Sequence, residues 1–83
     1  MKQEDSQTLA RDIVNSAEAA GIKLISCKIN YEPIDALVTV IVESKDGRGG
    51  VYRADYPDLL NPYFRSDFVK RVATLGDPTI RYA

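Results

Sequence analysis

Side chains that commonly carry enzyme chemistry are scarce in this sequence. It has no histidine and one cysteine, Cys27. It therefore cannot assemble a Ser-His-Asp or Cys-His arrangement, or the several cysteine and histidine ligands of a zinc site. Cys27 falls on the apolar side of an alternating segment, where we expect a small hydrophobic residue with a raised pKa. We expect that the protein is not an enzyme and holds no metal or cofactor.

Carboxylates and glycines form two further patterns. Asp55 and Asp58 are the closest plausible carboxylate pair, but they flank Pro57 and are expected to cap the following turn. Asp46 stands in a glycine-rich loop without the other oxygen ligands of a calcium loop. Residues 47–50 have the GxxG spacing that KH domains place between two helices to meet phosphates. Here that spacing separates two strand-like segments, which predicts a hairpin loop with glycine at positive φ.

Composition and charge are those of an ordinary globular domain. Hydrophobic residues make up 45% and charged residues 28%, and eleven basic side chains face twelve acidic ones. Proteins that bind nucleic acid through its phosphates usually carry a basic excess, which is missing here. A single cysteine cannot form an intramolecular disulfide. Residues 1–7 have no apolar stretch typical of a signal peptide, and no run approaches the roughly 20 apolar residues of a membrane span. We therefore expect a reducing, cytoplasmic compartment.

An amphipathic helix is predicted over residues 6–20. Asp5 or Ser6 can cap its first turn, and Gly21 can end it in the left-handed conformation. Its apolar positions are spaced four, four and three residues apart, so they share one helix face: Leu9, Ile13, Ala17 and Ala20.

A second helix near the C-terminus repeats this spacing. Asn61 followed by Pro62 is typical of an N-cap and a first helical residue, and Gly76 is expected to close the helix. Its apolar positions are Phe64, Phe68, Val72 and Leu75. The tail, residues 79–83, alternates and could add a short fourth strand.

Between the helices the apolar period changes to two, which predicts three antiparallel strands. Their expected ranges are 25–31, 37–43 and 51–56, and the two-sided apolar character of 37–43 is typical of a central strand. The first strand should bury Ile25, Cys27, Ile29 and Tyr31. We predict one α+β domain over residues 1–83, with residues 1–5 flexible. Its expected architecture is a two-layer sandwich of order α-β-β-β-α-(β), in which both helices pack on one face of a three-stranded antiparallel meander.

The order α-β-β-β-α across residues 6–76 resembles that of the double-stranded-RNA-binding domain. That family contacts phosphates with a lysine cluster at the start of its second helix, whereas residues 62–67 hold one arginine and one aspartate. The resemblance implies a fold analogy and an alternative function, nucleic-acid binding. Its phosphate contacts would be Lys28, Arg48, Arg53, Arg65 and Arg81.

If both helices cover one sheet face, the other face stays open. The alternation places an apolar centre there with charges of both signs around it, which is typical of a protein–protein patch and also of an ordinary sheet face. The partner-binding residues predicted on this face are Lys28, Leu37, Thr39, Ile41, Glu43, Arg53, Asp55 and Arg81. We expect a cytosolic inhibitor, adaptor or regulator that docks on another protein, of the kind that phages and mobile elements use to block a host enzyme. A homodimer through the open face or an edge strand is a further expectation.

Overall fold

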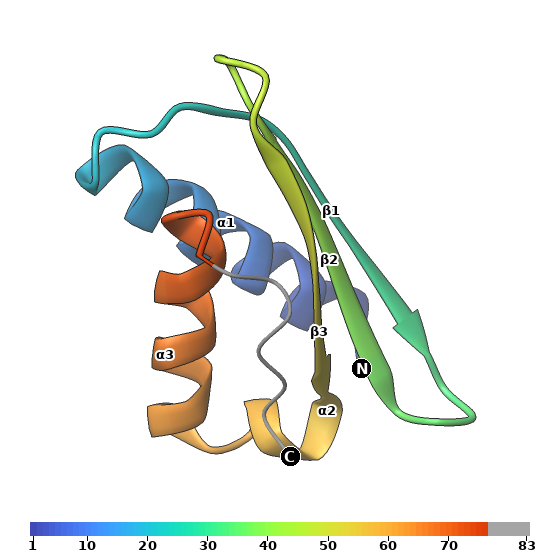
Figure 1. Ribbon diagram of the computed structural model, residues 1–83. Helices are drawn as coiled ribbons and strands as arrows, with labels where there is room; N and C mark the ends of the chain where they lie inside the picture. The colour runs from blue at the N-terminus through green and yellow to red at the C-terminus, as the bar shows by residue number, and fades with distance from the viewer. Residues whose placement is uncertain (77–83) are drawn as a thin grey trace.

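The alternating segments form one antiparallel sheet in the computed structural model of the protein (Figure 1). The structure describes residues 1–76. Its elements, in chain order, are α1 (Gln3–Ala19), β1 (Leu24–Glu32), β2 (Leu37–Ser44), β3 (Gly49–Asp55), α2 (Tyr56–Leu59) and α3 (Pro62–Ala73). The predicted α+β order is confirmed, with the short α2 added. The strand predicted at 79–83 lies outside the described residues.

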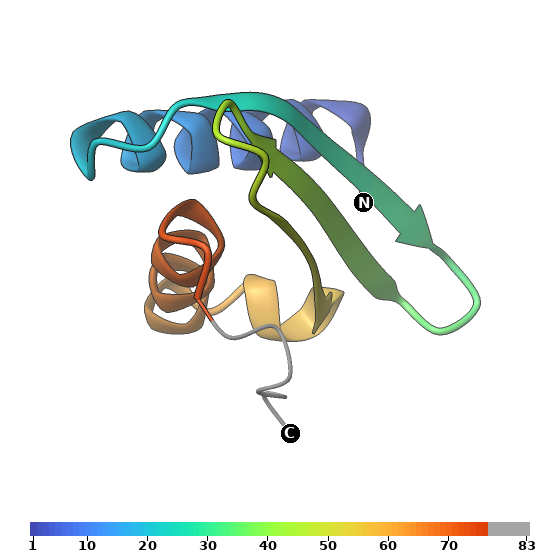
Figure 2. The same cartoon turned by 45° about the horizontal axis from the view of Figure 1, so that its top comes forward.

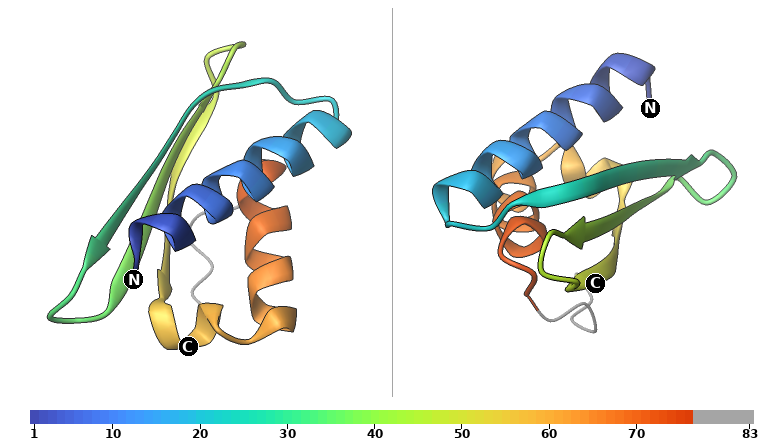
Figure 3. Two further views of the ribbon diagram at one scale, coloured as in Figure 1. Left: turned by 180° about the vertical axis from the view of Figure 1, so that it is seen from behind. Right: turned by 90° about the horizontal axis from the view of Figure 1, so that it is seen from above.

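Both long helices lie on the same side of the sheet, as predicted, and α1 runs across α3 (Figures 2 and 3). The central strand β2 supplies the middle of the core, because every second residue of it points toward the helices. The largest fully buried side chains are Ile13, Val38, Val40, Val42, Phe68 and Val72. The core therefore lies between α1, α3 and one face of the sheet.

Helix α1 begins earlier than predicted. Lys2 is its N-cap residue, and the Asp5 carboxylate accepts a hydrogen bond from the Lys2 backbone N–H at 3.4 Å. Neither Asp5 nor Ser6 is therefore the N-cap residue, although the Asp5 side chain does accept a backbone N–H at this end of the helix, as predicted. Gln3 to Asp5, which we expected to be flexible, are helical. Its end agrees with the prediction, because Gly21 has a φ of 80°.

Helix α3 begins and ends close to the predicted residues. The Asn61 side chain accepts hydrogen bonds from the backbone N–H groups of Tyr63 (2.9 Å) and Phe64 (3.4 Å), which confirms the cap. The left-handed residue at the other end is Leu75 (φ 55°), and not Gly76. The Leu75 side chain packs against the core, which offsets a backbone cost of about 1–2 kcal/mol.

Strand β1 departs from strict alternation at its start. Its register with β2 shifts between Leu24 and Ser26, so one extra residue is inserted as a β-bulge. As a result Leu24 packs against the core and Ile25 is 59% exposed. The prediction that Ile25 is buried is wrong for this reason.

A short helical turn, α2, replaces the predicted end of the third strand. The Tyr56 backbone N–H donates to the Ala36 carbonyl (2.8 Å), which ties the end of β3 to the β1–β2 turn. The Tyr56 ring packs edge-on against Tyr31, with 5.5 Å between ring centroids. Leu59 of α2 is buried in the core, so this turn is part of the packed domain.

Candidate functional site

The sheet face turned away from α1 and α3 carries the predicted partner-binding residues. Arg81 is the exception, because it lies outside the described residues. The other residues alternate with Val38, Val40 and Val42, which are buried against the helices. We call this surface the open sheet face. It is formed by Ser26, Lys28, Asn30 and Glu32 of β1, Leu37, Thr39, Ile41 and Glu43 of β2, and Val51, Arg53 and Asp55 of β3.

The centre of the open sheet face is apolar. In the cross-strand register, Ile41 of β2 lies opposite Val51 of β3. The exposed fractions of Ile41 and Val51 are 45% and 39%. Leu37, four residues before Ile41 on the same face, is partly exposed. Adjacent β-branched side chains on neighbouring strands make a contiguous apolar patch instead of isolated exposed residues.

Charges of both signs surround this patch. Lys28 lies opposite Ile41, Arg53 lies opposite Thr39, and Asp55 lies opposite Leu37. Within residues 1–76 the ion pairs are Arg48–Asp46, Arg65–Asp12 and Arg71–Asp67, none of which uses a charge of the open sheet face. One carboxylate oxygen of Glu32 accepts a hydrogen bond from the Ile34 backbone N–H at 2.8 Å. Lys28, Glu43, Arg53 and Asp55 take part in none of these ion pairs.

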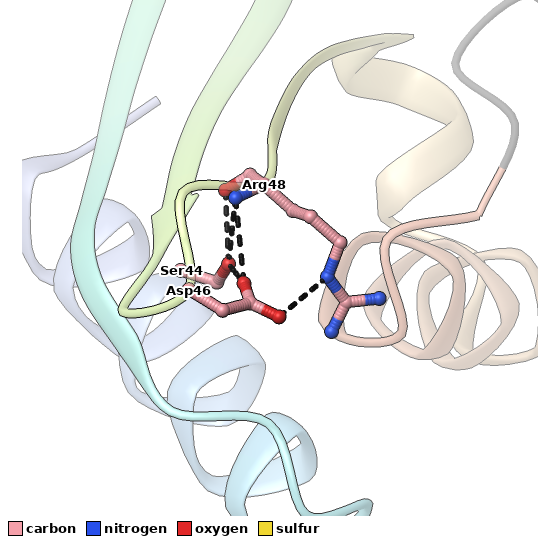
Figure 4. Close-up of polar contacts among 3 residues, drawn as sticks. All are labelled: Ser44, Asp46 and Arg48. Carbon is pink, nitrogen blue, oxygen red and sulfur yellow. Dashed lines mark hydrogen bonds and ion pairs between the residues drawn. The ribbon is translucent and has the colours of Figure 1, made fainter.

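The loop between β2 and β3 is held by its own side chains (Figure 4). The buried Ser44 hydroxyl donates to the Asp46 carboxylate and accepts from the Arg48 backbone N–H at 3.1 Å. Arg48 Nε donates to the other oxygen of Asp46 at 2.8 Å. The hydrogen bond from Ser44, and then those from Arg48 together with its charge, lower the pKa of Asp46.

The glycines of this loop have structural roles. Gly47 has a φ of 89°, which confirms the expected left-handed residue. A Cβ atom on Gly49 would lie 2.8 Å from the Val42 carbonyl oxygen, closer than atoms can approach without displacement. The GxxG spacing is thus explained by the hairpin itself.

Cys27 and Asp55, which we considered for catalysis, lie on different strands of the sheet. Cys27 is half-buried and lies opposite Val42, and burial raises the pKa of its thiol, as predicted. Asp55 precedes α2 at the N-cap position, but its side chain makes no capping hydrogen bond. The prediction that Asp55 caps this turn is therefore wrong.

A groove between α1 and α3 was not predicted from the sequence. It has a volume of about 710 Å³, and the ion pair between Arg65 and Asp12 (2.7 Å) closes part of its wall. Small side chains line much of it, among them Ala19, Ala20 and Ala73. Ala20 was expected in the buried stripe of the first helix, but it is the C-cap residue and is exposed. The groove arises where the two helices cross, which no local pattern reveals.

Among the described residues, no three His, Cys, Asp or Glu side chains are placed to hold a metal ion. None of the helices between residues 1 and 76 has the length and apolar character that crossing a membrane requires. Comparisons of the chain with protein-family models, curated protein sequences and solved structures found no match.

Proposed function

We propose that this protein is a protein-binding module that docks through the open sheet face. The observation that carries the proposal is the exposed pair Ile41 and Val51, adjacent in register at the centre of a face that no described helix covers. When a partner covers apolar surface that the monomer exposes to water, burial of that surface favours binding by about 25 cal/mol per Å².

The surrounding charges favour a protein over a nucleic acid as the partner. Lys28 and Arg53 lie on the same face as the carboxylates of Glu43 and Asp55. Carboxylates repel phosphate groups, whereas a protein surface can place a complementary charge against each of them and so fix the docking orientation.

The mode of action we propose is occupation of a partner's surface, as an inhibitor, adaptor or regulator in the cytoplasm. A phage or mobile-element accessory protein that blocks a host enzyme is one form of this role. The absence of histidine and the core-facing position of Cys27 support docking over catalysis.

The experiment compares proteins captured from a lysate of the native host by the wild type and two variants. Ile41→Asp places a carboxylate at the centre of the patch, while Ile34→Asp makes the same change on the β1–β2 turn, where the side chain is 90% exposed. We expect a partner that binds the wild type and I34D but not I41D. Far-UV circular dichroism and thermal unfolding verify that both variants fold. Equal capture by I41D and the wild type would contradict the proposal.

Nucleic-acid binding is the alternative, supported by the confirmed order of helices and strands. Two of its five cationic residues, Arg48 and Arg65, already pair with carboxylates, and Arg81 lies outside the described residues. Phosphate binding would weaken steeply as salt is added. A mobility-shift titration with double-stranded RNA at low salt therefore separates the functions, since our proposal predicts no shifted band.

A further inference from the structure

The outer edge of β1 is less completely covered than the rest of the core. Ile29 and Tyr31 of β1 lie opposite Val40 and Val38 of β2. The two valines are fully buried, whereas Ile29 and Tyr31 are only partly buried. The other edge strand differs, because the core-facing side chains of β3 are buried: Tyr52 is 3% and Ala54 is 6% exposed.

Among the described residues no other strand pairs with the outer edge of β1, and α1 begins close to the second half of this strand (Figure 3). The first half is irregular, because the bulge falls between Leu24 and Ser26. Residues 28–32 continue in regular register with β2. An edge strand presents backbone N–H and C=O groups that another strand can pair with, so residues 28–32 are the part of this edge suited to pairing.

We propose that a second copy of this chain pairs with β1 along residues 28–32, antiparallel and centred on Asn30. This register sets Lys28 opposite Glu32 of the second copy, and Glu32 opposite Lys28 of the second copy. It also sets Ile29 opposite Tyr31 of the second copy, on the core side, and Asn30 opposite itself. Opposite charges and aromatic–β-branched pairs directly across antiparallel strands are favourable combinations.

Charge selects this register over a close alternative. Centring the pair on Lys28 would place two lysines directly opposite each other, which is destabilising. Pairing centred on Asn30 also leaves the bulge at residues 24–26 outside the paired segment. The dimer would be a continuous six-stranded sheet, three strands from each copy, with the helices of both copies on the same side.

The inference goes beyond the proposed function and does not depend on the partner of the open sheet face. The interface is two-fold symmetric, so each copy contributes the same residues. Five paired residues make a small interface, and we therefore expect a dimer that dissociates on dilution. Dimerisation would join the two open sheet faces into one surface of twice the width.

Disulfide trapping tests the register directly. With Cys27 replaced by serine, Asn30→Cys puts one cysteine at the symmetric centre, where directly opposite Cα atoms about 4.5–5.5 Å apart can be bridged. Thr39→Cys is the matched control, because Thr39 is the register partner of Asn30 on β2 and lies on the same face. We expect N30C to form a covalent dimer under mild oxidation and T39C to remain monomeric. A T39C dimer, with or without one in N30C, would place the contact on the sheet face and overturn the proposal, as would no dimer in either variant.

Charge reversal provides a second measurement, with sedimentation equilibrium as the readout. Lys28→Glu should raise the dimer dissociation constant about tenfold, since two attractive pairs become repulsive. The double variant K28E/E32K restores opposite charges and should recover dimerisation. Arg53→Glu makes the same charge change on β3 and should leave it unaltered. A wild type that is monomeric at every concentration would overturn the proposal. So would a double variant whose dimer dissociation constant is as high as that of K28E.

Discussion

Ser44 and Asp46 show how two side chains fix the conformation of a loop that a glycine-rich sequence would otherwise leave open. The Ser44 hydroxyl is buried and satisfied by Asp46 and Arg48. The buried polar side chains of residues 1–76 all have hydrogen-bond partners, as buried polar groups need. The loop is therefore an ordered end of the β2–β3 hairpin, which supports β2 and with it the centre of the open sheet face.

The lowered pKa of Asp46 predicts a pH dependence of stability. Because its folded-state pKa lies below the ordinary value of 3.8, the Asp46 carboxylate stabilises the fold above that pH. The contribution is lost as the pH falls through 3.8 toward the folded-state pKa. Urea unfolding measures the free energy of unfolding at about pH 6 and about pH 3. The decrease between the two pH values should be smaller for Asp46→Asn than for the wild type. Ser44→Ala should also reduce the loss, but by less than D46N, because the Ser44 hydrogen bond is the largest cause of the lowered pKa and Arg48 still lowers it. An equally steep loss in D46N would contradict this explanation.

At the scale of elements, helix α3 depends on its cap. Asn61 supplies the side-chain acceptor for the first turn, and Pro62 follows at the position where a missing N–H costs least. The helix must be anchored there because its buried face, which includes Phe68 and Val72, covers the sheet.

Replacing the cap should therefore destabilise the whole domain. We expect Asn61→Ala to lower the free energy of unfolding by about 1 kcal/mol, whereas Asn61→Asp, which can still cap, should lose much less. Urea denaturation of the two variants measures the difference. Equal stability of N61A and the wild type would show that the cap contributes nothing.

The elements that local chemistry determines could be predicted, and those that depend on distant contacts could not. Apolar spacing located both long helices, and alternation located the three strands and the composition of the open sheet face. The β-bulge exposes Ile25 through a register shift with β2, and α2 forms where the Tyr56 N–H meets the Ala36 carbonyl. Neither contact has a signature in the neighbouring residues. The half-buried state of Ile29 and Tyr31 likewise follows from β1 being an edge strand, which only the sheet order reveals.

At the scale of the molecule, the two long helices pack on one side of a three-stranded sheet, and no helix within residues 1–76 covers the other side. A chain of 83 residues buries only about 60–65% of the surface that its unfolded form exposes. Some apolar side chains therefore stay in contact with water. Two of the exposed apolar side chains, Ile41 and Val51, lie next to each other on the sheet, whereas Ile25, Ile34, Leu60 and Tyr63 are exposed elsewhere. Under the proposed function, this pair is the place where a partner would bind.

The proposed function requires that a protein partner bind the apolar centre of the open sheet face. The most direct measurement is titration calorimetry of the captured partner with the wild type, Ile41→Asp and Ile34→Asp. Truncating a hot-spot residue, a kind that clusters near the centre of an interface, costs about 2 kcal/mol or more. If Ile41 is such a residue, I41D should weaken binding by about thirtyfold or more. I34D, the same change on the β1–β2 turn, should bind like the wild type. Equal affinity of I41D and the wild type, with both variants folded, would contradict the claim.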